Sequence, residues 1–198
     1  MLKRILPFAL AGIILTLAAC MVPEKFTAEY EIKPDGGYAF VYEGTMVDAL
    51  SRMARLEAEK EGEDMPAADN LQELVGAFKS DPRVIEFKEV SKETYQVRME
   101  DKGNIKEALT VHFIDDKLDY WRLIYSAEAN TVTLEIAPLK AKDLDEVQVK
   151  IDGSFEIKTD CEIVSSTVEL DESFFSNTYS FKVDNTLSEG ASIIMKLQ

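Results

Sequence analysis

Few residues of this sequence have the type and spacing that chemistry at a protein site requires. The two cysteines, Cys20 and Cys161, are far apart, and His112 is the only histidine. Zinc sites need several Cys or His ligands at close spacing, and a catalytic triad needs a recognisable nucleophile and base. Ser165 and Ser166 lack the glycines of a nucleophile elbow, and no glycine-rich phosphate-binding or dinucleotide-binding motif occurs. We therefore expect no catalytic residue, no metal site, no cofactor and no enzymatic activity.

Clusters of acidic residues are the other candidates for chemistry. They are Asp115, Asp116 and Asp119, followed by Asp143, Asp145 and Glu146. Neither has the spacing and terminal glutamate of a calcium-binding loop, and aspartate is a common turn residue, so solvated turns are the favoured interpretation and calcium binding is the alternative. A glycosidase pair would need a particular distance between two carboxylates, which a sequence does not supply.

The first twenty residues have the pattern of a secretory signal. Lys3 and Arg4 precede an apolar run from Ile5 to Leu17, and small residues follow before Cys20. The run is too short to cross a hydrocarbon core of ~30 Å comfortably. Positive charge, a short apolar region and small residues in this order are typical of a cleaved signal peptide.

The end of this signal, Leu17, Ala18, Ala19 and Cys20, resembles the lipobox of bacterial lipoproteins. The resemblance implies that signal peptidase II cuts before Cys20 and that diacylglycerol is attached to the Cys20 thiol. The new amino group is then often acylated, with a fatty acid such as palmitate. The alternative is an ordinary signal peptide that happens to end in cysteine.

The residue after the cysteine bears on the membrane. An aspartate there is the familiar inner-membrane retention signal of enteric-type bacteria, whereas this chain has Met21. We therefore expect the outer membrane, facing the periplasm, in a cell that has one, and the outer face of the cell membrane otherwise. Two acyl chains suffice for stable anchoring.

Composition limits the partners of the mature chain. Residues 1–19 hold two of the 22 basic residues and none of the 37 acidic ones, so the remaining 179 residues carry a formal charge of −17. An acidic surface repels nucleic acid and anionic lipid. We expect a lipidated N-terminus and short tether over residues 20–25, and a single ectodomain over residues 26–198.

The ectodomain begins with a predicted hairpin and helices. Apolar alternation over residues 26–32 and 38–42 surrounds the turn sequence Pro34-Asp35-Gly36-Gly37. Apolar residues then recur at helical spacing, which predicts an amphipathic helix with Arg52 and Arg55 largely on its other faces. That stripe is Met46, Ala49, Leu50, Met53 and Leu56. A second helix is predicted from Asp69 or Asn70, with Glu73 as capping partner, to the break at Asp81-Pro82.

Residues from Val84 onward predict strands. Alternating pairs and triplets run along the rest of the chain: Ile85/Phe87, Tyr95/Val97/Met99, Leu109/Val111/Phe113, Leu118/Tyr120, Val132/Leu134/Ile136, Val147/Val149/Ile151, Phe155/Ile157, Tyr179/Phe181/Val183 and Ile193/Met195/Leu197. Short runs separated by turn sequences favour antiparallel hairpins. We therefore expect an α+β fold: a large antiparallel, meander-like sheet of about nine to eleven strands, with two amphipathic helices inserted after the hairpin and covering part of it.

Several single residues can be interpreted within this scheme. Cys161 is expected to be a small buried strand residue rather than a reactive thiol, and His112 a structural or surface strand residue. Tyr120 should point opposite to Trp121 and Tyr125 on a strand. Ordinary core packing is the favoured role of these aromatics, and an apolar cleft able to hold an acyl chain is the alternative.

The two ends of the mature chain resemble the LppM-type domain of bacterial lipoproteins. The matching positions are Asp35, Gly36 and Gly37 in the first hairpin, Gly153, and the Asn177-Thr178-Tyr179 approach to the penultimate strand. The resemblance implies a non-enzymatic envelope protein that can interact with lipid, and it adds no site residues. We expect Cys20 to be the only link to the membrane.

These observations lead to three hypotheses for function. The first is a lipid-anchored binding module of the envelope, with a lipid or another apolar molecule as a candidate ligand. The second is a structural or assembly lipoprotein that docks an envelope protein. The third, an envelope-polymer hydrolase, is the least favoured, because no nucleophile and base can be recognised together.

Overall fold

The computed structural model describes residues 21–62, 76, 78–114, 120–138, 141–173, 176–185, 187 and 189–198. The signal and lipobox residues up to Cys20, the start of the second predicted helix, Leu118 and the cluster from Asp115 to Asp119 lie outside these residues. Residues 78–80 are helical and Asp81 is not, so the predicted end of the second helix is confirmed.

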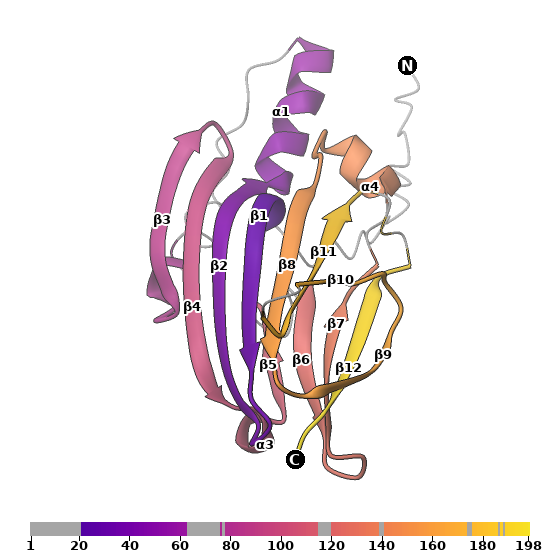
Figure 1. The fold of residues 1–198 in the computed structure, drawn as a ribbon. Helices are drawn as coiled ribbons and strands as arrows, with labels where there is room; N and C mark the ends of the chain where they lie inside the picture. Colours follow the sequence, from indigo (N-terminus) through magenta and orange to yellow (C-terminus); the bar gives the residue numbers. More distant parts are fainter. Residues whose placement is uncertain are drawn as a thin grey trace, which may run out of the picture.

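The described residues form two β-sheets with short helices at their ends (Figure 1). The seven-stranded sheet has the order β10-β11-β8-β1-β2-β4-β3, and the five-stranded sheet has the order β5-β6-β7-β12-β9. In chain order the elements are β1 (Met21–Ile32), β2 (Gly37–Asp48), α1 (Ala49–Glu61), β3 (Val84–Ser91), β4 (Thr94–Asn104), α3 (Ile105–Ala108), β5 (Thr110–His112), β6 (Trp121–Ser126), β7 (Thr131–Ile136), α4 (Ala141–Glu146), β8 (Asp152–Thr159), β9 (Glu162–Ser166), β10 (Asp171–Glu172), β11 (Thr178–Asp184) and β12 (Ala191–Lys196).

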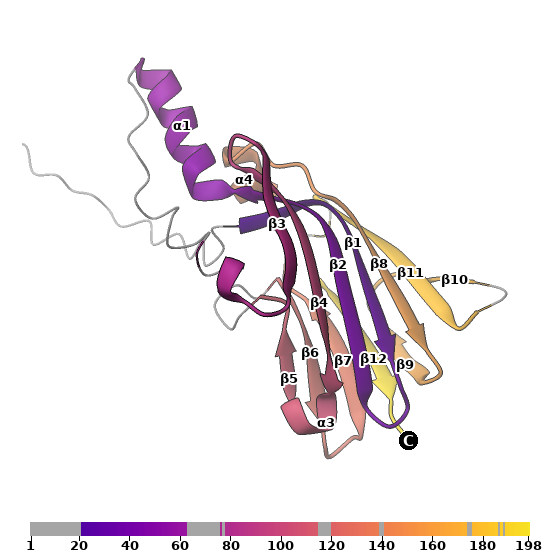
Figure 2. The ribbon, with the colours of Figure 1, turned by 90° about the vertical axis from the view of Figure 1, so that its left-hand side faces the viewer.

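The β-rich α+β class is confirmed, but the single antiparallel meander is wrong. The strands divide between two layers that face each other (Figure 2), and β1 pairs with β8 in parallel. Alternation in a sequence shows which side chains share a face, but it carries no information about which distant strand lies next to which. The N-terminal strand thus takes a central place, between β2 and β8.

The first strand begins earlier than the sequence predicts. Met21 is already paired with Asp48 of β2, and Met21 and Val22 are buried. The short tether expected over residues 20–25 is therefore wrong for residues 21–25, which belong to β1. Apolar side chains at positions 21 and 22 favour this outcome, because burying them in the sheet stabilises the domain.

The first predicted helix is present, but it begins later in the sequence and lies elsewhere relative to the sheet than predicted. It begins after Asp48, whose side chain accepts a hydrogen bond from the Ser51 amide at 3.0 Å, and ends at Gly62, which has a φ of 70°. Met46 is part of β2 and not of the helix. Figure 2 shows α1 extending beyond the strand ends, so it does not cover a sheet face as predicted.

Two further local predictions need correction. The alternation of Ile85 and Phe87 predicts one shared face, but Ile85 is 59% exposed and Phe87 is half-buried, because the register with β4 shifts between Val84 and Glu86. The predicted strand over Val147–Ile151 is instead irregular backbone before β8. Gln148 there has a φ of 52°, which a continuous strand does not allow.

Candidate functional site

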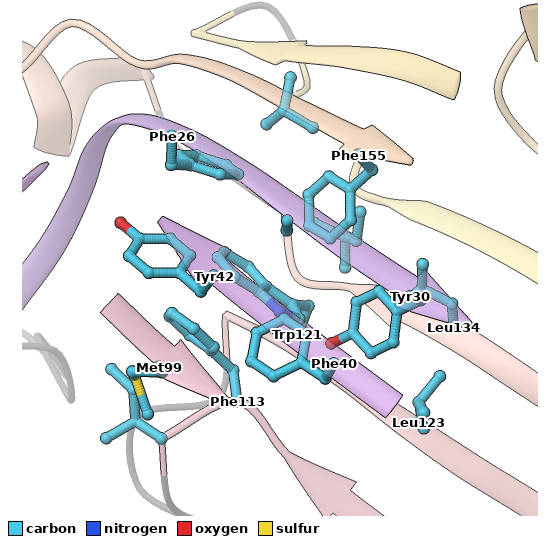
Figure 3. Packing of buried hydrophobic residues seen from close by; sticks show 14 of the residues in the cluster. Phe26, Tyr30, Phe40, Tyr42, Met99, Phe113, Trp121, Leu123, Leu134 and Phe155 are labelled. Atoms are coloured by element: carbon cyan, nitrogen blue, oxygen red, sulfur yellow. The ribbon is translucent and has the colours of Figure 1, made fainter. Parts of the chain in front are cut away.

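Aromatic side chains from both sheets occupy the space between them. Phe26 and Tyr42 of the seven-stranded sheet meet Trp121 of the five-stranded sheet, with centroid distances of 5.3 Å from Phe26 and 6.1 Å from Tyr42 (Figure 3). Phe113 stacks on Trp121 at 3.9 Å, and Phe155 meets it edge-on at 5.0 Å. These rings are core residues, as the favoured interpretation predicts for Trp121.

The apolar gap beside these rings is very small. It is lined by Phe26, Tyr120, Trp121 and other apolar side chains and has a volume of about 10 Å³. A single water needs roughly that much space. This gap therefore has no room for an acyl chain.

Buried tyrosines complete the interior. Burial raises the pKa of Tyr30, and the neighbouring Trp121 indole opposes that shift. The indole N–H forms no hydrogen bond of regular geometry. Burial also raises the pKa of Tyr42, whose hydroxyl donates to the Thr45 carbonyl at 3.3 Å. Both side chains are neutral at physiological pH and act in packing.

One end of the sandwich contains the first residues of β1 and the segments that lie next to them in the fold. We call it the anchor end: the first residues of β1 (Met21–Lys25), the start of α1, the β3–β4 turn at Glu93, and the β8–β11 end at Asp152 and Asp184. The strand register brings them together, since Met21 pairs with Asp48, and Asp152 pairs with both Lys25 and Asp184. Figure 1 shows α1 and α4 at this end.

A charge network joins α1 to the β3–β4 turn. Glu93, whose side chain is 6% exposed, accepts from Arg55 Nε at 2.9 Å and lies 3.5 Å from Arg52 Nε. Arg52 also donates to Thr94 Oγ1 at 3.1 Å. Hydrogen bonds to Glu59 and then to Glu93 raise the pKa of Arg55. The network holds the base of α1 against the sheet and so fixes the direction in which the helix projects.

A hollow of about 450 Å³ lies beside α4 at the anchor end, with Asp145, Lys150 and Asp184 in its lining. Asn185 fixes its wall: its side-chain oxygen accepts from the Ile151 amide at 2.7 Å, and its amide donates to the Val149 carbonyl at 3.2 Å. The hollow is open and of mixed charge, which suits a solvated surface.

The opposite end, which we call the distal end, is closed by hydrogen bonds between the sheets. It consists of the β1–β2 turn, α3, the β6–β7 turn and the C-terminus. The Gln198 amide donates to the Pro34 carbonyl at 2.9 Å, and Lys106 Nζ of α3 donates to Gln198 O at 3.3 Å. A second hollow, of about 480 Å³, lies here between the β1–β2 turn and the end of β8.

Arg83 links the two sheets along one side. Its guanidinium donates at 3.0 Å to the carbonyl of His112, the last residue of β5, and also to the carbonyl of Ile114, just after β5. The same guanidinium pairs with Asp81 at 2.7 Å. Burial raises the pKa of Asp81, but side-chain and backbone hydrogen bonds from Arg83 outweigh it, so the pKa is lowered overall.

The residues singled out from the sequence are dispersed. Cys161 is buried, as predicted, but it lies in the bend before β9 and not in a strand, and its amide donates to Thr159 Oγ1 at 3.0 Å. His112 lies in β5, as predicted. Asp145 and Glu146 are exposed, as predicted, but they lie in the helix α4 and not in a turn. Within the described part of the chain, no three His, Cys, Asp or Glu side chains could hold a metal ion together.

The groups that sequence reasoning missed are the arginines and their acceptors. Arg52 and Arg55 were expected on the outer faces of a helix, and Glu93 and Arg83 were not considered. Their contacts join segments about 30 to 40 residues apart in the chain, a range that helical or strand periodicity does not reach.

Among the described helices, none is both long enough and apolar enough to cross a membrane.

Comparisons with known proteins give only distant likenesses. No family model matches the sequence, and no curated protein matches it significantly. The folded domain of the Mycobacterium tuberculosis LppM protein is similar over 89% of this chain and 91% of that domain, with 11% identity and a TM-score of 0.46. Yeast LTA4 hydrolase in complex with bestatin aligns with 90% of this chain but only 29% of its own, with 9% identity and a TM-score of 0.40.

Proposed function

We propose that this chain is a non-enzymatic lipoprotein of the bacterial envelope, anchored through lipid on Cys20, whose folded domain is an interaction module for a protein partner. The observation that carries the proposal is the interior, where rings from both sheets stack on Trp121 and fill the space beside it. Recognition then falls to the outer surface of a rigid sandwich. The competing function, carriage of a lipid or another apolar ligand, needs a cavity that these rings do not leave.

The anchor rests on the residues before the first strand. The sequence Leu17, Ala18, Ala19, Cys20 ends directly before a folded domain, where a lipoprotein is cut and acylated. Met21 after the cysteine favours the outer membrane in a cell with two membranes. Two or three acyl chains would hold the protein at its membrane stably.

Metabolic labelling with a clickable fatty acid tests the anchor. The wild-type chain should take up label, Cys20→Ser should take up none, and Cys161→Ser should be labelled like the wild type because its thiol is buried. An unlabelled wild-type protein would contradict lipidation.

Two measurements on the same protein test the interaction module. Crosslinking in intact membranes should recover a recurrent protein partner in constant ratio to the lipoprotein. Native mass spectrometry after incubation with envelope lipids should show the chain without a bound lipid. A lipid retained in a one-to-one complex would overturn protein docking in favour of lipid carriage.

A further inference from the structure

We propose that the anchor end of the sandwich, with α1 projecting from it, lies directly against the lipid surface and that the strands stand away from the membrane. This inference rests on the proposed lipidation of Cys20. The bilayer surface is thus what the anchor end contacts. A protein partner would then bind the distal end and the sides of the domain.

Attachment without a tether is the first step. Met21 is fully buried and paired with Asp48, so the fold begins at that residue. Consecutive Cα atoms are about 3.8 Å apart, which holds Cys20 within that distance of the first residue of β1. A lipid on the Cys20 thiol therefore keeps the anchor end within a few ångströms of the headgroups.

The direction of α1 is the second step. The helix starts at Ala49, next to the strand position paired with Met21, and continues past the strand ends on the anchor side (Figures 1 and 2). Its thirteen residues give a length of about 20 Å. A helix that extends from the attachment point must meet the headgroup region unless the domain tilts away.

Charge and fixation are the third step. The α1 segment carries three basic and three acidic side chains, so it lacks the net negative charge of the rest of the chain. Glu93 binds Arg55 at 2.9 Å and lies near Arg52, so the helix base is fixed to the sheet. A helix without net charge is repelled less by anionic lipid than the acidic surface as a whole.

The length of the domain makes the orientation measurable. The twelve residues of β1 span roughly 40 Å, so the distal end lies about that far from the attachment point in an upright domain. Lys60 in the last turn of α1 and Glu128 in the β6–β7 turn are exposed and mark the two ends.

The test couples the chain from Cys20 to Gln198 to a maleimide phospholipid in phosphatidylcholine vesicles. This chain contains the whole described fold, and Cys161→Ala leaves Cys20 as its only thiol. Lys60→p-azidophenylalanine or Glu128→p-azidophenylalanine takes a donor dye, and a headgroup-labelled lipid is the acceptor. Because the lipid is attached chemically, the result does not depend on whether the cell lipidates Cys20, which the fatty-acid labelling decides.

Energy transfer should be several-fold greater from position 60 than from position 128. A flexible Gly-Ser linker of about 20 residues between Cys20 and Met21 should remove most of that difference, because the domain then tumbles freely. Equal transfer from both positions in the directly attached protein would overturn the inference, and so would a difference that the linker leaves unchanged.

Discussion

The ring of Phe26 lies over the backbone of Gly153, its register partner on the parallel strand β8. A Cβ atom at position 153 would lie 2.9 Å from Phe26 Cδ1 and closer still to Cε1 and Cζ. On the other side of β1, Gly44 is the register partner of Phe26, and a Cβ there would lie 2.5 Å from Phe26 Cβ. Gly153 thus makes room for the Phe26 ring that packs on Trp121, and Gly44 makes room for the β1 backbone at Lys25 and Phe26.

Gly153→Ala should destabilise the domain because the added methyl group displaces the Phe26 ring. We expect a loss of about 3 kcal/mol in the free energy of unfolding, the upper part of the range for overpacked cores. Urea unfolding followed by the fluorescence of Trp121, the only tryptophan, measures it.

A matched glycine substitution and a double variant control this prediction. A Cβ at Gly76 would meet nothing within 4 Å, so Gly76→Ala in a helix should cause no loss of stability. Phe26→Leu combined with Gly153→Ala should cost less than the sum of the two single changes. Strict additivity would show that the ring and the glycine do not interact.

This arrangement illustrates what the sequence could and could not predict. The turn at Gly36 is confirmed, with a φ of 93° and a hydrogen bond from its amide to the Lys33 carbonyl at 2.9 Å, because the sequence Asp-Gly-Gly determines its own local geometry. Gly153, by contrast, ends the sequence Ile-Asp-Gly, which on its own indicates a turn. It is a strand residue whose need for glycine comes from Phe26, more than a hundred positions earlier.

The same distinction holds for the candidate site. Helical periodicity predicts α1, but the direction of the helix depends on the contacts of Arg52 and Arg55 with Glu93, which no local pattern contains. Alternation identifies Trp121 as a strand aromatic, and only the pairing of two sheets shows that it sits among other rings. Lipidation of Cys20, predicted from a motif, stays a prediction.

Arg83→Lys should weaken the link between the two sheets. Lysine keeps the charge, but a single ammonium group does not reproduce the fork that reaches Asp81 and the carbonyls of His112 and Ile114. We expect a loss of about 2 kcal/mol in unfolding free energy. Arg98→Lys on the exposed sheet face is the matched control and should change stability by less than about 0.5 kcal/mol. Equal effects at both positions would contradict the role of Arg83.

Acid should remove part of the same link. The pKa of Asp81 is lowered in the fold, so its pairing with Arg83 stabilises the domain above about pH 4 and is lost as the pH falls through the folded pKa. Asp81→Asn should lower stability at neutral pH and flatten its dependence on pH below about 4. Unfolding free energies of both proteins across that range give the test, and parallel curves would exclude the pair as a source of acid sensitivity.

Glu93→Gln should loosen the base of α1. The change removes the carboxylate charge next to Arg52 and Arg55, whose side chains are 14% and 25% exposed. Because both arginine side chains are partly exposed to solvent, we expect a loss of about 2 kcal/mol in the free energy of unfolding, which is less than the cost of breaking a fully buried ion pair. Faster amide exchange in α1 should accompany it, whereas Glu57→Gln on the exposed side of the helix should leave exchange unchanged. Loss of stability without faster exchange in α1 would place the effect elsewhere.

Alkaline solution should destabilise the protein through its buried tyrosines. Burial raises the pKa of Tyr30 and Tyr42 above 10.0, so above pH 10.0 the unfolded chain ionises these side chains while the folded chain keeps them neutral. Each tyrosine then lowers the unfolding free energy by up to about 1.4 kcal/mol per pH unit above its unfolded pKa. Tyr30→Phe with Tyr42→Phe should flatten this decline. Phenolate absorbance of Tyr30 and Tyr42 should rise only as the protein unfolds, and ionisation of both in the native state would contradict their burial.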